Sequence, residues 1–101
     1  MTKYLENSWR FSGEVINVNE LTGEFGASIK IRGFAKRPNA FSSSVVELLC
    51  LTFPDVYFDA QKRGLKRYIS ISASGHVESW EKGGSLKTYF IADKIEITGG
   101  F

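Results

Sequence analysis

The sequence predicts a single all-β domain. Several stretches alternate between apolar and polar residues, which is the period of a strand with one buried face. Ten glycines against two prolines favour tight turns between regular elements. A chain of 101 residues is the size of one domain, expected over residues 1–101 with short flexible ends. Its 43% hydrophobic content is enough to form a core and excludes intrinsic disorder.

The first half of the chain predicts three strands, over residues 9–18, 26–34 and 45–53. The second alternates most cleanly, with small and branched apolar side chains on one face and Lys30, Arg32 and Phe34 on the other. The third is almost entirely apolar, which is typical of a strand that is covered on both faces.

Residues 54–63 are the one helix candidate. Pro54 suits a first helical turn and Gly64 suits the residue after the last turn. Because so short a helix needs tertiary packing to persist, we expect Tyr57 and Phe58 to anchor it to the strands.

Two further strands are expected at residues 68–80 and 87–97. In the first of them the serines, including Ser72, fall on the outward side. Gly75 interrupts the inward side and predicts a bulge or bend. Asp93 interrupts the apolar side of the last strand, so a bulge or a local hydrogen bond is expected there as well.

The predicted order is therefore three strands, a short helix and two strands. This is the order of the OB-fold, a five-stranded Greek-key barrel that binds oligonucleotides on the face of its second and third strands and with flanking loops. An immunoglobulin-like sandwich fits less well, because it requires about seven strands.

Basic residues are segregated from acidic ones, although the net charge is only +2. No Asp or Glu lies between Phe25 and Val46, or between Ala60 and Val77. Both stretches contain four basic residues: Lys30, Arg32, Lys36 and Arg37 in the first, Lys62, Arg63, Lys66 and Arg67 in the second. The segregation predicts a basic groove. The alternative is that the two basic stretches are simply solvent-exposed faces without a binding role.

Nothing in the sequence assembles a catalytic centre. The single histidine, His76, falls on the outward side of a strand, and the single cysteine, Cys50, lies in an apolar run typical of an inert core thiol. One cysteine can form neither an intramolecular disulfide nor a zinc cluster. We expect no enzyme activity, cofactor, metal or small-molecule substrate. The absence of a signal peptide or a long apolar stretch predicts a cytoplasmic protein without membrane contact.

Exposed aromatic residues accompany the basic ones. Proteins that bind single strands without sequence preference combine a positive groove with rings on which bases stack. Trp80 has outward parity and precedes a Gly-Gly turn, so we expect it to stack a base; the alternative is that it folds back on the barrel. Phe34 and Phe41 are further stacking candidates. The candidate phosphate contacts are Lys30, Arg32, Lys36, Arg37, Lys66, Arg67 and Lys87.

Five short motifs resemble the bacterial and phage single-stranded DNA-binding protein family. They are the central glycine of the first strand (11–15), the third strand (46–50), the Lys-Arg-Gly that precedes the fourth strand (62–71), the glycine and tip aromatic (75–80), and the closing strand (87–97). The spacing from Gly75 to Trp80 is shorter than is usual in the family, and the long acidic C-terminal tail has no counterpart here.

The resemblance implies that Trp80 is the tip aromatic that stacks on DNA, with Phe34, Phe41 and Phe53 as looser candidates. It also implies a homo-oligomer, either a dimer or a tetramer, acting in DNA replication, recombination or repair. The missing tail fits a compact version from a phage, plasmid or mobile element. The expected function is non-catalytic, largely sequence-independent binding of single-stranded DNA. The alternatives are an OB-fold accessory subunit that binds a protein partner, such as a primosome or recombination component, and an RNA-binding domain.

Overall fold

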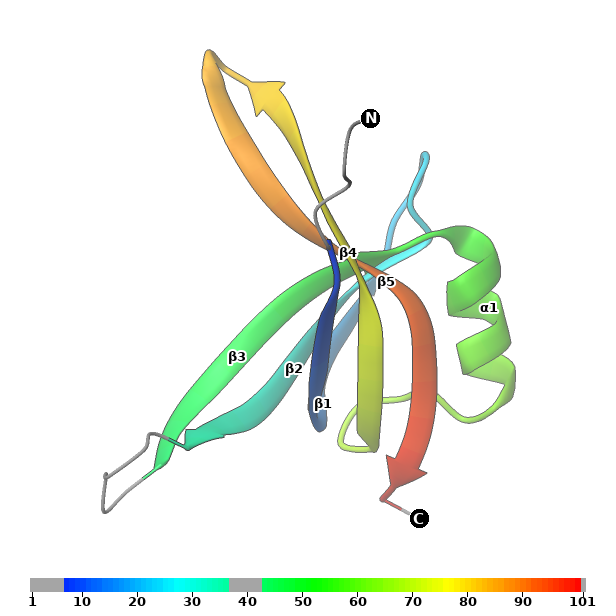
Figure 1. The fold of residues 1–101 in the computed structure, drawn as a ribbon. Helices are drawn as coiled ribbons and strands as arrows, with labels where there is room; N and C mark the ends of the chain where they lie inside the picture. Colours follow the sequence, from blue (N-terminus) through cyan, green and yellow to red (C-terminus); the bar gives the residue numbers. More distant parts are fainter. Residues whose placement is uncertain (1–6, 37–42, 101) are drawn as a thin grey trace, which may run out of the picture.

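Five strands close into a barrel in the computed structural model, which describes residues 7–36 and 43–100 (Figure 1). The elements are β1 (Trp9–Glu20), β2 (Ala27–Lys36), β3 (Ser43–Thr52), α1 (Pro54–Lys62), β4 (Ser70–Lys82) and β5 (Ser85–Gly99). Around the barrel the strands follow the order β1-β2-β3-β5-β4, and only β3 and β5 pair in parallel. The predicted all-β OB-fold, with one helix between the third and fourth strands, is confirmed.

The core is built from alternate side chains of the strands. Ala27, Ile29 and Ile31 of β2 are fully buried, as the alternation predicts. Cys50 is buried beside them, and its burial raises the pKa of the thiol to about 12. The thiol therefore stays protonated at neutral pH, which fits the inert core residue expected from the sequence.

The prediction that the third strand is covered on both faces is wrong. Cys50 and Thr52 point into the barrel, but Val45 and Leu49 on the other side of β3 are 59% and 55% exposed. The reason is that no described element packs on the outer side of this strand, and α1 leaves the sheet at its end (Figure 1). The apolar run thus includes an exposed face as well as a buried one.

Helix α1 is attached to the barrel by one aromatic residue and not by two. Tyr57 is buried, with 4% of its surface exposed, whereas Phe58 is 52% exposed, so the prediction that Phe58 anchors the helix is wrong. Adjacent helical residues lie about 100° apart around the axis, so both cannot face the barrel. The helix ends where expected, because Gly64 adopts a φ of 110°. Within the described part of the chain, no helix has the length and apolarity needed to cross a membrane.

Ser72 of β4 faces outward, as the alternation predicts, but other side chains cover it and it is buried. Its neighbour in the sheet is Ser12 of β1, whose hydroxyl lies 3.2 Å from the Ser72 hydroxyl. The Arg10 Nε donates a second hydrogen bond to Ser72, also at 3.2 Å, so the long arginine side chain covers it.

A bulge divides the β4–β5 hairpin into a barrel part and a projecting part. Ser74 pairs with Lys94 and Gly75 with Ala92, so Asp93 has no opposing residue in the register. A Cβ at Gly75 would lie 1.8 Å from the Ile91 carbonyl oxygen, so only glycine fits. The irregularities predicted at Gly75 and Asp93 are therefore confirmed as one bulge. Beyond it the hairpin projects away from the barrel, as Figure 1 shows in yellow and orange.

Candidate nucleic-acid interface

Four aromatic rings from the β4–β5 hairpin, the β1–β2 loop and the end of β3 form a series of ring contacts. Trp80 stacks on Tyr89, with ring centroids 4.2 Å apart and 12° between the planes. Phe25 lies against Trp80 as well, at 6.0 Å and 14°. Phe25 in turn contacts Phe53 at 5.1 Å. We call Phe53, Phe25, Trp80 and Tyr89 the aromatic column.

The hairpin register aligns one end of this column. Trp80 lies directly opposite Lys87 in β5, and opposing residues project to the same face of a sheet. Tyr89 is two residues from Lys87 and shares that face. The two rings and the lysine ammonium therefore belong to one surface of the hairpin.

Gly26 aligns the other end. Its N–H donates to the Thr52 carbonyl at 2.7 Å, which joins the β1–β2 loop to the end of β3. A Cβ at Gly26 would lie 2.7 Å from the Pro54 Cα, so the absence of a side chain permits this close approach. Phe25 and Phe53, the neighbours of the joined residues, are thereby brought into contact.

Trp80 is half-buried, an outcome between the two alternatives that the sequence left open. β4 continues to Lys82, so Trp80 lies below the tip of the hairpin and not at it. A ring lies against each face of the indole, Tyr89 and Phe25. A base can therefore reach a face of Trp80 only where a neighbouring ring gives way.

The outer β2–β3 face extends from this column along the two strands. It comprises Ser28, Lys30, Arg32 and Phe34 of β2 and Val45, Glu47, Leu49 and Leu51 of β3, in directly opposing pairs. Phe34 is 74% exposed, as the alternation predicts. Lys30 is half-buried and lines a shallow hollow of about 200 Å³ with two asparagines of β1.

Arg32 forms an ion pair across this face. Its Nη2 lies 2.9 Å from the Glu47 carboxylate of β3, and its Nε donates to the same oxygen at 3.2 Å. The stretch of sequence around Arg32 contains no acid, but the strand register brings one directly opposite. The predicted basic groove is thus partly neutralised at this position.

Two of the predicted phosphate contacts lie far from the aromatic column. Lys66 and Arg67 are exposed in the connection from α1 to β4. The part of β4 from Ser70 to Trp80 separates them from the tryptophan of the column. At about 3.3 Å per residue this part of the strand is roughly 30 Å long. The Arg67 guanidinium instead lies over the ring of Tyr68, 4.9 Å from its centre.

Two of the remaining predicted residues lie on described strands of the two hairpins. Lys87 is exposed on the β4–β5 hairpin. Lys36 is the last residue of β2 and pairs with Ser43. Arg37 and Phe41 lie outside the described residues.

The sequence reasoning missed Phe25 and Tyr89. Phe25 is the only aromatic residue of the loop between β1 and β2, a position comparable to that of Phe41 in the next loop. Tyr89 shares parity with Lys87, which was identified. Both residues could therefore have been identified as candidates from the sequence. The contact of Phe25 with Trp80 could not, because it depends on the tertiary fold.

His76 forms two ion pairs just beyond the bulge. Its Nδ1 lies 2.6 Å from the Asp93 carboxylate and its Nε2 lies 2.5 Å from that of Glu78. Hydrogen bonds to Asp93 and then to Glu78 raise the pKa of His76 above its usual value. The protonated ring donates to both carboxylates. In residues 7–36 and 43–100, no group of three or more His, Cys, Asp or Glu side chains is arranged to hold a metal ion.

The barrel belongs to the OB-fold class, and comparison with solved structures agrees. A small single-stranded DNA binding protein from Mycoplasma pneumoniae matches with a TM-score of 0.66 at 16% identity, covering 91% of this chain and 93% of its own. An SSB from Plasmodium falciparum in complex with ssDNA matches at 0.58 and 15%, covering 100% of both chains. The dimeric N-terminal domain of PriB from Thermoanaerobacter tencongensis matches at 0.59 and 16%, covering 93% of this chain and 98% of its own. No family model and no curated protein sequence matches the chain.

Proposed function

We propose that this protein binds single-stranded DNA without catalysis and largely independently of base sequence. The observation that carries the proposal is the aromatic column, which joins the β4–β5 hairpin to the β1–β2 loop and to the end of β3. Stacking rings beside cationic side chains are what a sequence-tolerant single-strand site requires. The solved structures of similar fold include a single-stranded DNA binding protein and an SSB complex with ssDNA.

The proposed stacking site is the interval between Phe25 and Trp80. Their centroids are 6.0 Å apart, within the range of an offset-stacked pair, so a base enters only when the two rings separate. Separating two aromatic rings costs about 0.5–1.5 kcal/mol. Each new base–aromatic stack contributes about 1–3 kcal/mol, so insertion is favourable overall. Tyr89 and Phe53 support the two rings from behind.

The proposed phosphate contacts follow from which cations lie near the bases. Lys87 is opposite Trp80 on the hairpin, and Lys30 is exposed in part on the outer β2–β3 face. Arg32 contributes in competition with Glu47, to which it is already bound. Phe34 and Lys36, further along β2, remain candidates. Arg37 and Phe41, which lie outside the described residues, remain candidates from the sequence alone. The proposal leaves out Lys66 and Arg67.

We also propose that the chain forms a homo-oligomer, as the dimeric PriB domain of similar fold does. One observation favours a second candidate function, an OB-fold accessory subunit that binds a protein. Val45 and Leu49 present exposed apolar surface on the face where phosphates would pass. Apolar side chains in such a place are typical of protein interfaces.

The test is a titration with fluorescently labelled dT oligomers at several salt concentrations, run beside light scattering for the mass of the assembly. Single-strand binding predicts an affinity that falls steeply with salt. An affinity that does not change with salt would exclude the cationic surface as the site. Competition between poly-dT and poly-U separates a DNA-binding from an RNA-binding domain.

A further inference from the structure

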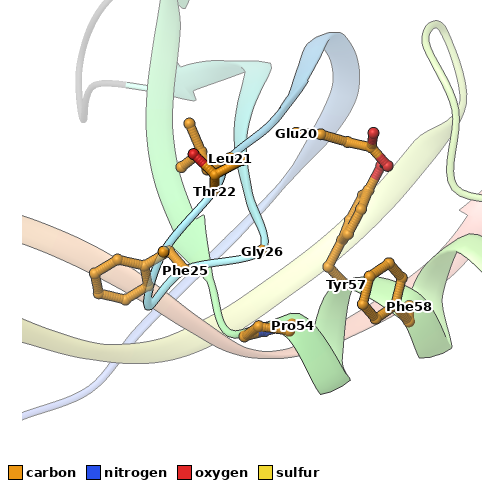
Figure 2. Close-up of a pocket in the computed structure, with 9 residues that line it drawn as sticks. Glu20, Leu21, Thr22, Phe25, Gly26, Pro54, Tyr57 and Phe58 are labelled. Carbon is orange, nitrogen blue, oxygen red and sulfur yellow. The ribbon is translucent and has the colours of Figure 1, made fainter.

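A second pocket lies on the other side of Phe25, between the β1–β2 loop and α1. Its volume is about 520 Å³. Figure 2 shows loop residues on one side of it and residues of α1 on the other. The apolar part of its lining is Leu21, Phe25, Pro54, Tyr57 and Phe58. No part of the outer β2–β3 face lines it.

Contacts within the chain hold both walls of the pocket in place. The loop is closed by a hydrogen bond from the Leu21 N–H to the Gly26 carbonyl, at 3.0 Å. Gly26 is in turn joined to the end of β3, and it lies against Pro54 at the start of the helix. The opposite wall contains Tyr57, which is buried and fixed in the core. An occupant therefore does not have to order the walls.

One charged group lines this pocket, and it is negative. The Tyr57 hydroxyl donates to the Glu20 carboxylate at 3.1 Å, as Figure 2 shows on its right side. Gln61 donates to the Tyr57 oxygen at 3.4 Å, so the hydroxyl is held from both sides. Burial and then the hydrogen bond to Glu20 raise the pKa of Tyr57, which keeps the phenol protonated and donating. The Glu20 carboxylate is thus fixed at the edge of an aromatic pocket.

The surroundings of the pocket disfavour a nucleotide. None of the residues that line it is Lys or Arg. The chain neighbours of the lining residues on both walls, Glu24 and Asp55, are exposed acids. The start of the helix does not attract phosphate either, because Pro54 has no N–H and Asp55 already occupies the first turn. A phosphate would therefore meet repulsion here.

We propose that this pocket binds a segment of a partner protein in which an arginine or lysine stands next to an apolar side chain. The apolar side chain packs against Leu21 and Phe58, which are the exposed parts of the two walls. The cationic head pairs with Glu20, and its stem lies against the exposed ring of Phe58, whose centroid is 5.4 Å from that of the buried Tyr57. The proposal goes beyond DNA binding and uses a different surface, with Phe25 at the border between the two.

The test uses the ¹⁵N-labelled full-length chain and two dipeptide probes that differ only in charge. N-acetyl-Leu-Arg-amide should shift the amide resonances of Thr22, Gly23, Gly26 and Phe58. N-acetyl-Leu-citrulline-amide has the same shape without the charge and should bind about twofold to fivefold more weakly, the size of one partly exposed ion pair. Glu20→Gln should remove this difference between the probes. Phe58→Ala should weaken both, whereas Leu86→Ala, which removes an exposed apolar side chain from the hairpin, should change neither.

Three results would overturn the proposal: no shift at millimolar arginine probe, equal affinity for the two probes, or a dT oligomer that shifts the Phe58 amide, away from Phe25, and displaces the arginine probe. The last result would assign the pocket to nucleic acid. Glu20→Gln and Phe58→Ala should retain the wild-type affinity for dT oligomers. Failure of the peptide site is therefore distinguishable from failure of DNA binding, since each is measured with its own probe.

Discussion

His76 binds Asp93 across the bulge in the β4–β5 hairpin, with 2.6 Å between the imidazole Nδ1 and the carboxylate oxygen. Asp93 is the residue that the bulge leaves without a partner in the register. The other imidazole nitrogen, Nε2, is hydrogen-bonded to the Glu78 carboxylate. The ring thus joins both strands of the hairpin at the place where it bends, and it helps to set the direction in which Trp80 is held.

The stability of the protein should depend on pH through His76. Its pKa is raised in the folded state above the ordinary 6.5, first by Asp93 and then by Glu78. The two ion pairs of His76 therefore stabilise the folded state fully below about pH 6.5, provided that the carboxylates are ionised. This stabilisation is lost as the pH rises through the raised pKa of His76 in the folded state. His76→Gln should cost about 0.5–1 kcal/mol at pH 6 and less at pH 9. Urea unfolding of both proteins at the two pH values checks this, and a gap that widens toward pH 9 would contradict it.

Gly75→Ala should destabilise the fold by about 3 kcal/mol or more. The new methyl group would lie 1.8 Å from the Ile91 carbonyl oxygen, and backbone on both strands would have to move. Gly99→Ala is the matched control, because the nearest atom to its Cβ is the Ser70 Cβ at 3.8 Å. Chemical denaturation measures both. Equal stability of the two variants would mean that the bulge is easily displaced.

Phe25→Ala should weaken binding to a dT oligomer about threefold to tenfold. The variant loses one base stack of about 1–3 kcal/mol but no longer has to separate Phe25 from Trp80, which costs about 0.5–1.5 kcal/mol. Phe58→Ala, which truncates an exposed aromatic ring outside the column, is the control. If Phe25→Ala instead tightens binding, Phe25 competes with the base for the face of Trp80 and the insertion model fails.

The fluorescence of Trp80 should be quenched when single-stranded DNA binds. Trp80→Phe should lose most of the quenching but retain much of the affinity, because phenylalanine still stacks. Trp80→Ala should lose both, at a cost of about 1–3 kcal/mol. Trp9→Phe should leave the quenching intact, since the Trp9 indole packs edge-on against Phe90 and donates to the His76 carbonyl at 2.8 Å. Quenching that follows Trp9 instead would move the site off the hairpin.

Salt should weaken DNA binding with a log–log slope of about −3 to −4, the value for about four to six phosphate contacts on a single strand. Lys30→Ala with Lys87→Ala should reduce this slope by about 1.4. Lys66→Ala with Arg67→Ala removes the same charge at the other end of β4 and should leave the slope unchanged. Binding isotherms at five salt concentrations suffice. The opposite ranking of the two double variants would place the phosphate path around the α1–β4 connection.

Local pattern predicted the elements of the fold well, and the reason is visible in β2. Ala27, Ile29 and Ile31 are buried because alternation alone determines which face of a strand enters the core. The bulge was foreseen for a similar reason, since Gly75 and Asp93 both interrupt their local pattern. In β3 the residues of both faces are apolar, so alternation does not indicate which face is buried. The prediction that both faces are covered was therefore wrong.

The candidate site was less predictable because it depends on contacts between distant segments. Glu47 neutralises Arg32 only through the register of the β2–β3 hairpin, which composition does not determine. Phe25 reaches Trp80 only because Gly26 joins the loop to the end of β3. Trp80 itself was identified from parity and resemblance, but the sequence could not predict that Phe25 and Tyr89 lie against its ring.

The parallel pairing of β3 with β5 closes the barrel with three residue pairs, from Cys50–Phe90 to Thr52–Ala92. By comparison, β1 and β4 are joined by a ladder from Trp9–Gly75 to Glu14–Ser70. The barrel thus consists of a three-stranded meander and a hairpin, with one strong and one weak junction between them. Partial opening of the native state should begin at the weak junction, at a lower free energy than global unfolding. Native-state hydrogen exchange would detect this as earlier loss of protection at the amides that join β3 to β5 than at the amides of the β1–β4 ladder.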